Sequence, residues 1–176
     1  TTGLSVSGVS TFAGVGAFGG NVEIASGTLH IGDEIAHYGD TDTNIGFPAA
    51  DTFTVDTAGS ERLRIDSGGK ILAGTTSSRN VAGGAAKIQI EATSSEGMSI
   101  LRTSDDNGGV YLSLGKTRDG SVCQAGDKLG YISWNGDDGT DLAHPSAEIY
   151  TEVATGIGGN DVPGDLIFST NGGTTT

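Results

Sequence analysis

The sequence has little of the bulky apolar material that builds a compact core. Its 176 residues include one Trp, one Met, one Cys and three Pro, and Leu, Ile, Val and Phe together number 38. That share is close to the level of about 20% below which chains tend to stay disordered. The single cysteine, Cys123, excludes an intrachain disulfide, and we expect it to be a small, buried or half-buried apolar residue.

Positive charge and long apolar runs are also scarce. Nine Lys and Arg stand against 22 Asp and Glu, which gives a formal net charge of -13. Because binding to phosphates requires clustered Lys and Arg, we expect no nucleic-acid partner. No apolar run approaches the roughly 18 residues of a membrane-spanning helix, so we expect no membrane insertion. No signal peptide is recognisable, and because the chain begins at Thr1 without Met, we expect it to be part of a longer polypeptide.

Glycine and small hydroxyl residues are abundant instead. Gly occurs 31 times, where about 12 would be usual for this length, and Ser and Thr together number 38. Two interpretations fit this composition: a disordered acidic chain, or a thin β structure punctuated by Gly that gains its core by oligomerising. The regular two-residue alternation of apolar and polar side chains favours the β structure, because disordered chains have no such period.

The clearest alternation lies in residues 51–74, which we predict to form three very short strands separated by Gly turns. Each strand carries two apolar residues on one face, since residues i and i+2 share a face. These residues are Phe53 and Val55, Leu63 and Ile65, and Ile71 and Ala73. Two apolar residues per strand cannot form a core alone. Such pieces need neighbouring chains or many stacked copies, as in a fibre.

The N-terminal residues 1–31 read as short strand pieces with a loose repeat of about ten residues, ending in the alternating pair Leu29 and Ile31. A further strand is predicted from Ile35 to Tyr38. No stretch in this region has the period of a long helix. We therefore predict a thin β-fibre segment over residues 1–74.

Residues 75–86 are small and polar, and we predict them to be a linker. Beyond it, residues 87–176 are predicted to form a wider β module, in which 87–170 is a meander of five or six strands. The meander includes a hairpin over 98–114, because Asn107-Gly108 favours a tight turn between two alternating apolar runs.

Two stretches resemble a known family. Ser60-Glu-Arg-Leu-Arg-Ile-Asp-Ser-Gly-Gly-Lys70 is similar to a recurring step in tail fibre proteins of marine, cyanobacterium-infecting phages. Gly126 to Asp141, with Ala147-Glu-Ile149 and Asp161 to Thr170, resembles the shaft module of the same proteins. The resemblance covers roughly residues 40–74 and 120–172. It implies a homotrimeric fibre on a virion whose usual task is attachment to the host surface.

Carboxylate pairs are the first candidates for chemistry: Asp33 with Glu34, Asp105 with Asp106, and Asp137 with Asp138. A glycoside-cleaving site would need two carboxylates across a cleft together with aromatic platforms. We interpret the Asp pairs as turn residues, because Asp bonds readily to its local backbone.

The second candidates are cation sites. Asn135, Asp137 and Asp141 offer oxygen atoms at i, i+2 and i+6, an incomplete calcium loop without a closing Glu. Residues 158–161 match one partial copy of a calcium-binding repeat. A metal held by His30 or His37 from each of three chains is a further alternative, while His144 has no partner at metal-ligand spacing. Cys123 lacks the neighbours of a nucleophile.

The last candidates concern interfaces. Arg62 and Arg64 lie on the strand face opposite Leu63 and Ile65, either exposed or paired with Asp56, Glu61 or Asp66 of a neighbouring chain to fix register. Trp134 and Tyr150 could stack on sugars, but we interpret them as core or interface residues.

The sequence as a whole predicts an all-β, elongated homotrimeric fibre: thin intertwined β repeats followed by a wider prism or sandwich-like module. The inward apolar positions would form the core between the chains: Phe53, Val55, Leu63, Ile65, Ile71, Leu112, Ile132, Ile149, Leu166 and Phe168. We expect a structural and adhesive role without catalysis, cofactor or bound metal. The expected partners are copies of the chain, other phage tail proteins and a host-surface glycan or protein. A bacterial surface filament or adhesin and a polysaccharide-degrading tailspike are the alternatives.

Overall fold

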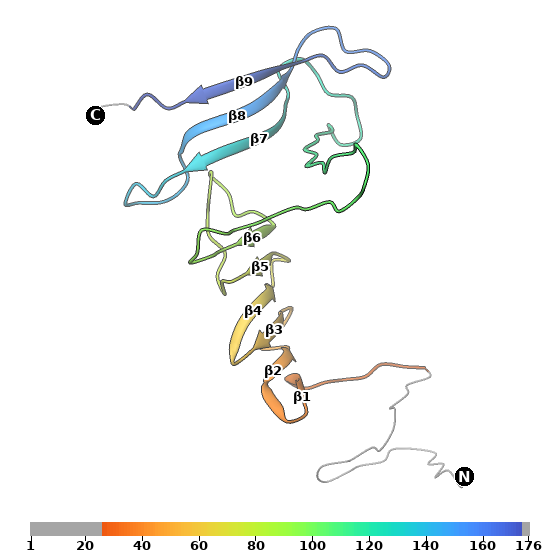
Figure 1. The fold of residues 1–176 in the computed structure, drawn as a ribbon, viewed down its shortest axis with the longest axis vertical. Coiled ribbons are helices and arrows are strands. Elements are labelled where there is room, and N and C mark those ends of the chain that lie inside the picture. The colour runs from red at the N-terminus through yellow and green to blue at the C-terminus, as the bar shows by residue number, and fades with distance from the viewer. Residues whose placement is uncertain (1–25, 174–176) are drawn as a thin grey trace. The chain divides into compact units, whose positions relative to one another are not determined.

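The structure, a computed structural model, describes residues 26–173. As predicted, the described chain is all-β: it has nine strands in two sheets and no helix (Figure 1). The chain divides into two units, residues 1–32 and 33–176, and the nine strands belong to the second. The strand pieces predicted within residues 1–25 lie outside the described residues. Leu29 and Ile31, predicted as a strand pair, lie in no strand, so that prediction is wrong.

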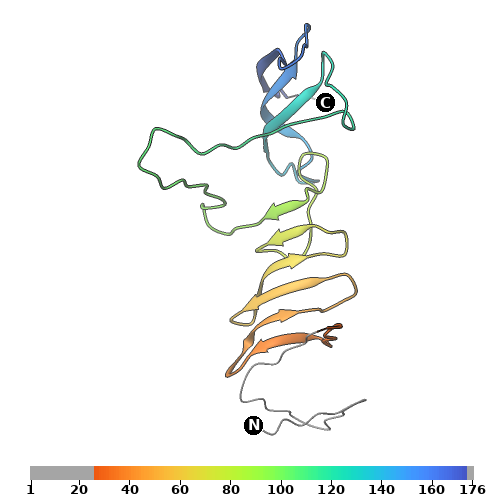
Figure 2. The ribbon, with the colours of Figure 1, turned by 90° about the vertical axis from the view of Figure 1, so that its right-hand side faces the viewer.

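The first sheet has six strands in sequential order. They are β1 (Glu34–His37), β2 (Asp40–Gly46), β3 (Phe53–Thr57), β4 (Ser60–Ile65), β5 (Ile71–Ala73) and β6 (Ile88–Ile90). Neighbours are antiparallel except β5 and β6, which are parallel, and Figure 2 shows the strands following one another as a ladder. The strand predicted from Ile35 and the three strands predicted in residues 51–74 are confirmed.

Local chemistry explains the tight turns of this sheet. Ala58 and Gly59 between β3 and β4 both have positive φ, 50° and 65°, which is the conformation of a two-residue hairpin turn. After β4, the Asp66 carboxylate accepts the N–H groups of Gly68 and Lys70, both at 2.9 Å. This Asp organises the Gly turn and holds β5 against β4.

The predicted linker, residues 75–86, lies between β5 and β6 and therefore joins two strands of one sheet. A parallel pair needs such a crossover, because its strands run in the same direction. The Ala82 N–H donates to the Leu142 carbonyl at 3.0 Å, so this crossover also contacts the loop after β7.

The second sheet is an antiparallel meander of β7 (Lys128–Asn135), β8 (Pro145–Val153) and β9 (Gly164–Thr170). The prediction of five or six strands in 87–170 is wrong, because β6 joins the first sheet and residues 98–114 form no hairpin. The apolar runs of 98–114 have no paired strand, and Arg102 instead bonds the Asp106 carboxylate and the Gly108 carbonyl.

Burial of apolar side chains is sparse. Among the described residues only two hydrophobic side chains are buried, Leu72 at 0% exposure and Val153 at 2%. Of the predicted core residues, Ile65, Ile71, Leu112, Ile132, Leu166 and Phe168 are exposed in the single chain, and Phe53, Val55, Leu63 and Ile149 are half-buried. Within the described part of the chain, no helix is long and apolar enough to cross a membrane.

Candidate functional site

The six-strand sheet places most of its apolar residues on one face. One row across the strands is Ile35, Ile45, Val55, Leu63, Ala73 and Ile90, and the next is Phe53, Ile65, Ile71 and Ile88. Cross-strand partners point to the same side of a sheet, so these ten residues form one surface, called here the first apolar face. The predicted alternation is therefore confirmed. Phe47 contacts Phe53 at this face, with 6.1 Å between ring centroids.

The opposite face of the same sheet is better covered. The row formed by Thr54, Arg64 and Leu72 contains two of the few buried residues, Thr54 and Leu72. Leu72 lies next to Ile71 in the sequence but on the other side of the sheet. The best-buried aliphatic side chain of this sheet was thus not among the predicted core residues, because alternation alone does not show which face the chain itself can cover.

Arg64 forms its ion pair within its own chain. Its Nε and a terminal nitrogen donate to the two Glu61 oxygens at 2.7 and 2.5 Å. Residues three apart on a regular strand point to opposite faces, but a bulge in β4 places Glu61 opposite Asp56 and Leu63 opposite Val55. The bulge therefore puts Glu61 on the face of Arg64, and this pairing raises the pKa of the Arg64 guanidinium.

The pairing of Arg64 with a neighbouring chain is accordingly not needed to satisfy its charge. Arg62, at the bulge, is exposed and donates its Nε–H to the Thr57 hydroxyl at 3.0 Å. Sequence spacing could not indicate the bulge, since it depends on the register between two strands.

The three-strand sheet also has one apolar side, called here the second apolar face. Ile132, Ile149 and Phe168 are direct cross-strand partners, and Gly130, Thr151 and Leu166 form the adjacent row. The predicted core residues of this region therefore share one face, as expected. Leu114 packs against Gly130, where an added Cβ would lie 2.6 Å from the Leu114 Cβ. Leu112 and Leu114 line a hollow of about 240 Å³ at this end of the face.

Trp134 and Tyr150 lie on opposite sides of this sheet. Trp134 pairs with Ala147 at the second apolar face, whereas Tyr150 pairs with Tyr131, and the two tyrosine rings stack with centroids 5.0 Å apart. The Lys128 ammonium lies 4.9 Å from the Tyr150 ring centroid. The two residues considered for sugar stacking therefore cannot act as one platform.

A buried carboxylate that the sequence did not single out anchors the entry to β7. Asp127 is 5% exposed and accepts hydrogen bonds from Lys116 Nζ at 2.6 Å and from Arg118 Nε and a terminal nitrogen at 2.7 and 2.8 Å. The backbone N–H of Gln124 adds a bond at 2.9 Å. Arg118, then Lys116, lower the pKa of this carboxyl far below its usual range.

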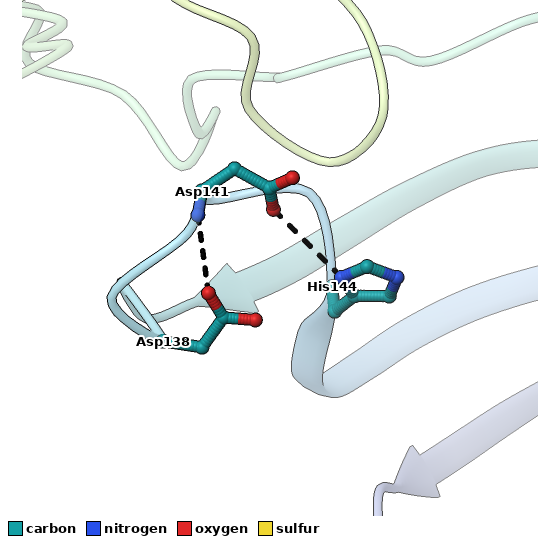
Figure 3. A group of neighbouring side chains, drawn as sticks. All are labelled: Asp138, Asp141 and His144. Carbon is teal, nitrogen blue, oxygen red and sulfur yellow. Dashed lines mark hydrogen bonds and ion pairs between the residues drawn. The ribbon is translucent and has the colours of Figure 1, made fainter.

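The loop between β7 and β8 brings together a mixed set of possible ligands, shown in Figure 3. Asp138, Asp141 and His144 are exposed, and each offers one atom within 4.8 Å of the others. Asp138 Oδ1 accepts the Thr140 and Asp141 N–H groups at 2.8 and 3.1 Å, and these bonds lower the pKa of Asp138. His144 Nδ1 lies 3.8 Å from Asp141 Oδ1. The carboxylates close the turn, and the three side chains could offer ligands to a divalent cation.

The calcium set considered from the sequence is only partly assembled. Asp141 belongs to the cluster, but Asp137 accepts the Gly139 N–H at 2.8 Å. Asn135 lies at the end of β7 and bonds to Ser133 and to the Leu142 carbonyl. Residues 158–161 form a tight turn closed by two backbone hydrogen bonds between Gly158 and Asp161.

The remaining candidates take local roles. Asp106 accepts the Gly108 N–H at 2.7 Å and the Arg102 guanidinium, which confirms the turn interpretation for this residue. His37 Nδ1 lies 3.7 Å from Asp40, and His30 is exposed. Cys123 is half-exposed, and its thiol donates to the Lys116 carbonyl at 3.3 Å. Asp33 accepts the Phe47 N–H through its backbone carbonyl.

Comparison with models of protein families finds no match to this chain, and comparison with curated protein sequences finds none either. The candidate functional surfaces are therefore identified from the structure of this chain alone. The most extensive of these surfaces are the first and the second apolar face.

Proposed function

We propose that this chain is a structural and adhesive segment of a viral tail fibre, in which three copies assemble into an elongated rod. The observation that carries the proposal is the openness of both apolar faces. Each sheet concentrates its aliphatic residues on one side, and yet only Leu72 and Val153 are buried among the described hydrophobic residues.

Open apolar faces of this size favour a partner. Exposed apolar patches that are contiguous over several strands usually mark contacts with other proteins, because leaving them in water forfeits about 25 cal/mol per Å². A cyclic arrangement of three chains would bring the first apolar faces together about one axis. The resemblance of residues 60–70 and 126–141 to phage tail fibre repeats supports the assignment to a virion.

The proposed mechanism is mechanical. Intermolecular packing of the faces stiffens the rod, which positions a contact with a host-surface glycan or protein and is held by other tail proteins. The Asp106 and Asp138 carboxylates are used in turns, which favours a structural role over a polysaccharide-degrading one.

The mass of the assembly in solution tests the proposal. Light scattering should give three times the 17.6 kDa of one chain, and denaturant should reduce it to one. A stable, folded monomer would refute the trimeric fibre. Release of reducing ends from host polysaccharide would instead support the tailspike alternative.

A further inference from the structure

The segment of residues 98–114 leaves most of its apolar side chains exposed. Leu101 is 87% exposed, Tyr111 is 85% exposed, and Met98 and Leu112 are also well exposed. Among the described residues, no backbone-to-backbone hydrogen bond involves residues 92–117. Alternating apolar and polar residues are typical of a strand that is paired and buried on one side. Residues 98–114 have this alternation, and yet they lie open to water.

The middle of this segment is nevertheless well organised. The Asp106 carboxylate accepts hydrogen bonds from the Arg102 guanidinium at 2.7 and 2.5 Å and from the Ser104 hydroxyl at 2.7 Å. Arg102 also donates to the Gly108 carbonyl at 2.8 Å. The turn is therefore fixed and the Arg102 charge is neutralised, which leaves two apolar arms, residues 98–101 and 110–114, on either side of it.

A surface of matching chemistry exists on the same chain. The second apolar face exposes Ile132, Trp134, Leu166 and Phe168. The chain's own Leu114 covers only the end of this face at Gly130. That contact demonstrates that the face accepts aliphatic side chains from this segment, while the part around Trp134 and Phe168 stays uncovered.

We infer that the 98–114 segment of one copy packs on the second apolar face of the next copy. The inference rests on the proposed trimer and names the surfaces that join its chains. Each copy carries both surfaces once, so the contact is between unlike patches, and such contacts can close into a ring.

The contact at Gly130 indicates a second copy as the occupant, because Leu114 of the same segment already packs on this face there. Two chains of net charge -13 repel each other, so copies can meet only where few carboxylates face one another. The exposed residues of the second apolar face are uncharged, and in the segment Arg102 balances Asp106, so that Asp105, in the turn between the arms, carries the one uncompensated charge of residues 98–114. The contact therefore joins two acidic chains through apolar surface.

The test combines substitutions on the arms with two measurements. The double variant Leu101→Asp with Tyr111→Asp is compared with Tyr38→Asp, because Tyr38 is fully exposed in the turn after β1. The measurements are mass by light scattering and acrylamide quenching of Trp134, which is the only tryptophan of the chain. Circular dichroism checks that the sheets remain folded.

In the wild-type assembly, Trp134 should be shielded from the quencher. The double variant should weaken assembly by about tenfold or more and expose Trp134, while Tyr38→Asp should leave both measurements unchanged. Phe168→Asp, on the receiving face, should reproduce the loss of assembly.

The failures of the inference and of the proposed function are distinguishable. A wild-type trimer whose mass and Trp134 shielding survive the double variant would overturn the inference and leave the trimer standing. A wild-type trimer in which acrylamide quenches Trp134 freely would also overturn the inference and leave the trimer standing. A monomeric wild-type chain would overturn both.

Discussion

At the scale of single residues, the Asp127 carboxylate accepts four hydrogen bonds at the start of the second sheet. This carboxylate links Lys116 and Arg118 to the start of β7. The backbone carbonyl of Asp127 accepts the Val153 N–H at 2.8 Å. One residue, through its side chain and its backbone carbonyl, thus ties the long segment between β6 and β7 to β7 and β8. Charge-assisted hydrogen bonds of this kind are stronger than neutral ones.

Replacing Asp127 with Asn should lower the unfolding temperature of the chain. The amide keeps the shape but removes the charge, which leaves Lys116 and Arg118 without their counter-charge. Thermal unfolding followed by circular dichroism measures the effect. Asp105→Asn, at an exposed position, removes the same charge as a control, and equal unfolding temperatures for the two variants would contradict the structural role of Asp127.

The pH dependence of the Asp127 contribution has a definite sign. Its folded-state pKa is lowered from the ordinary 3.8, so its contribution is present in full above the unfolded-state value and is lost as pH falls through the folded-state value. The stability difference between wild type and Asp127→Asn should therefore be constant from pH 5 upward and shrink below about pH 4. Denaturant unfolding at several pH values measures it. A difference that grows on acidification would be inconsistent with the lowered pKa.

At the scale of elements, the bulge in β4 decides the partner of Arg64. A double-mutant cycle with Glu61→Ala and Arg64→Ala should give a coupling free energy of about 1 kcal/mol, because the ion pair is bidentate and both side chains are mostly shielded from water. Arg62→Ala should cost less than about 0.5 kcal/mol, since Arg62 is exposed. Chemical denaturation supplies the values, and a coupling near zero would indicate that Arg64 pairs elsewhere.

The two sides of β5 allow a matched comparison between neighbouring residues. Leu72→Ala should cost about 2–5 kcal/mol of unfolding free energy, because Leu72 is fully buried within the chain. Ile71→Ala should instead weaken assembly, because Ile71 belongs to the first apolar face. Denaturation and light scattering together separate these effects. If Ile71→Ala leaves assembly unchanged, the first apolar face is not an interface.

Alternation along β3, β4 and β5 was sufficient to predict these strands and the residues that share the first apolar face, because a strand places every second side chain on one side. Three features could not be predicted from this alternation. The bulge at Arg62 depends on register, the Asp127 cluster joins residues nine and eleven positions apart, and the fate of 98–114 depends on whether a partner strand is present. Each of these is set by contacts between segments and not by a local pattern.

At the scale of the whole molecule, net charge opposes the proposed assembly through the apolar faces. Copies with a charge of -13 repel one another at neutral pH, and salt screens this repulsion over a distance of about 8–10 Å at physiological strength. Assembly should therefore tighten as salt is raised from low to moderate concentration. Sedimentation at several chain and salt concentrations measures this, and weaker assembly at higher salt would point to ion pairs as the main contact.

The sequential strand order of the first sheet has a consequence for how the molecule forms. From β2 to β5, each strand pairs with the strand that precedes it in the chain, so closing each pair requires only a short loop. Such local pairings form fast, on the order of 1–10 μs per hairpin, and the sheet can grow step by step during synthesis. Its apolar face is left uncovered by the described part of the chain, and in the proposed trimer other copies would cover it. If the proposed trimer forms, the encounter between chains should be its slow step, and the rate of assembly should rise with chain concentration.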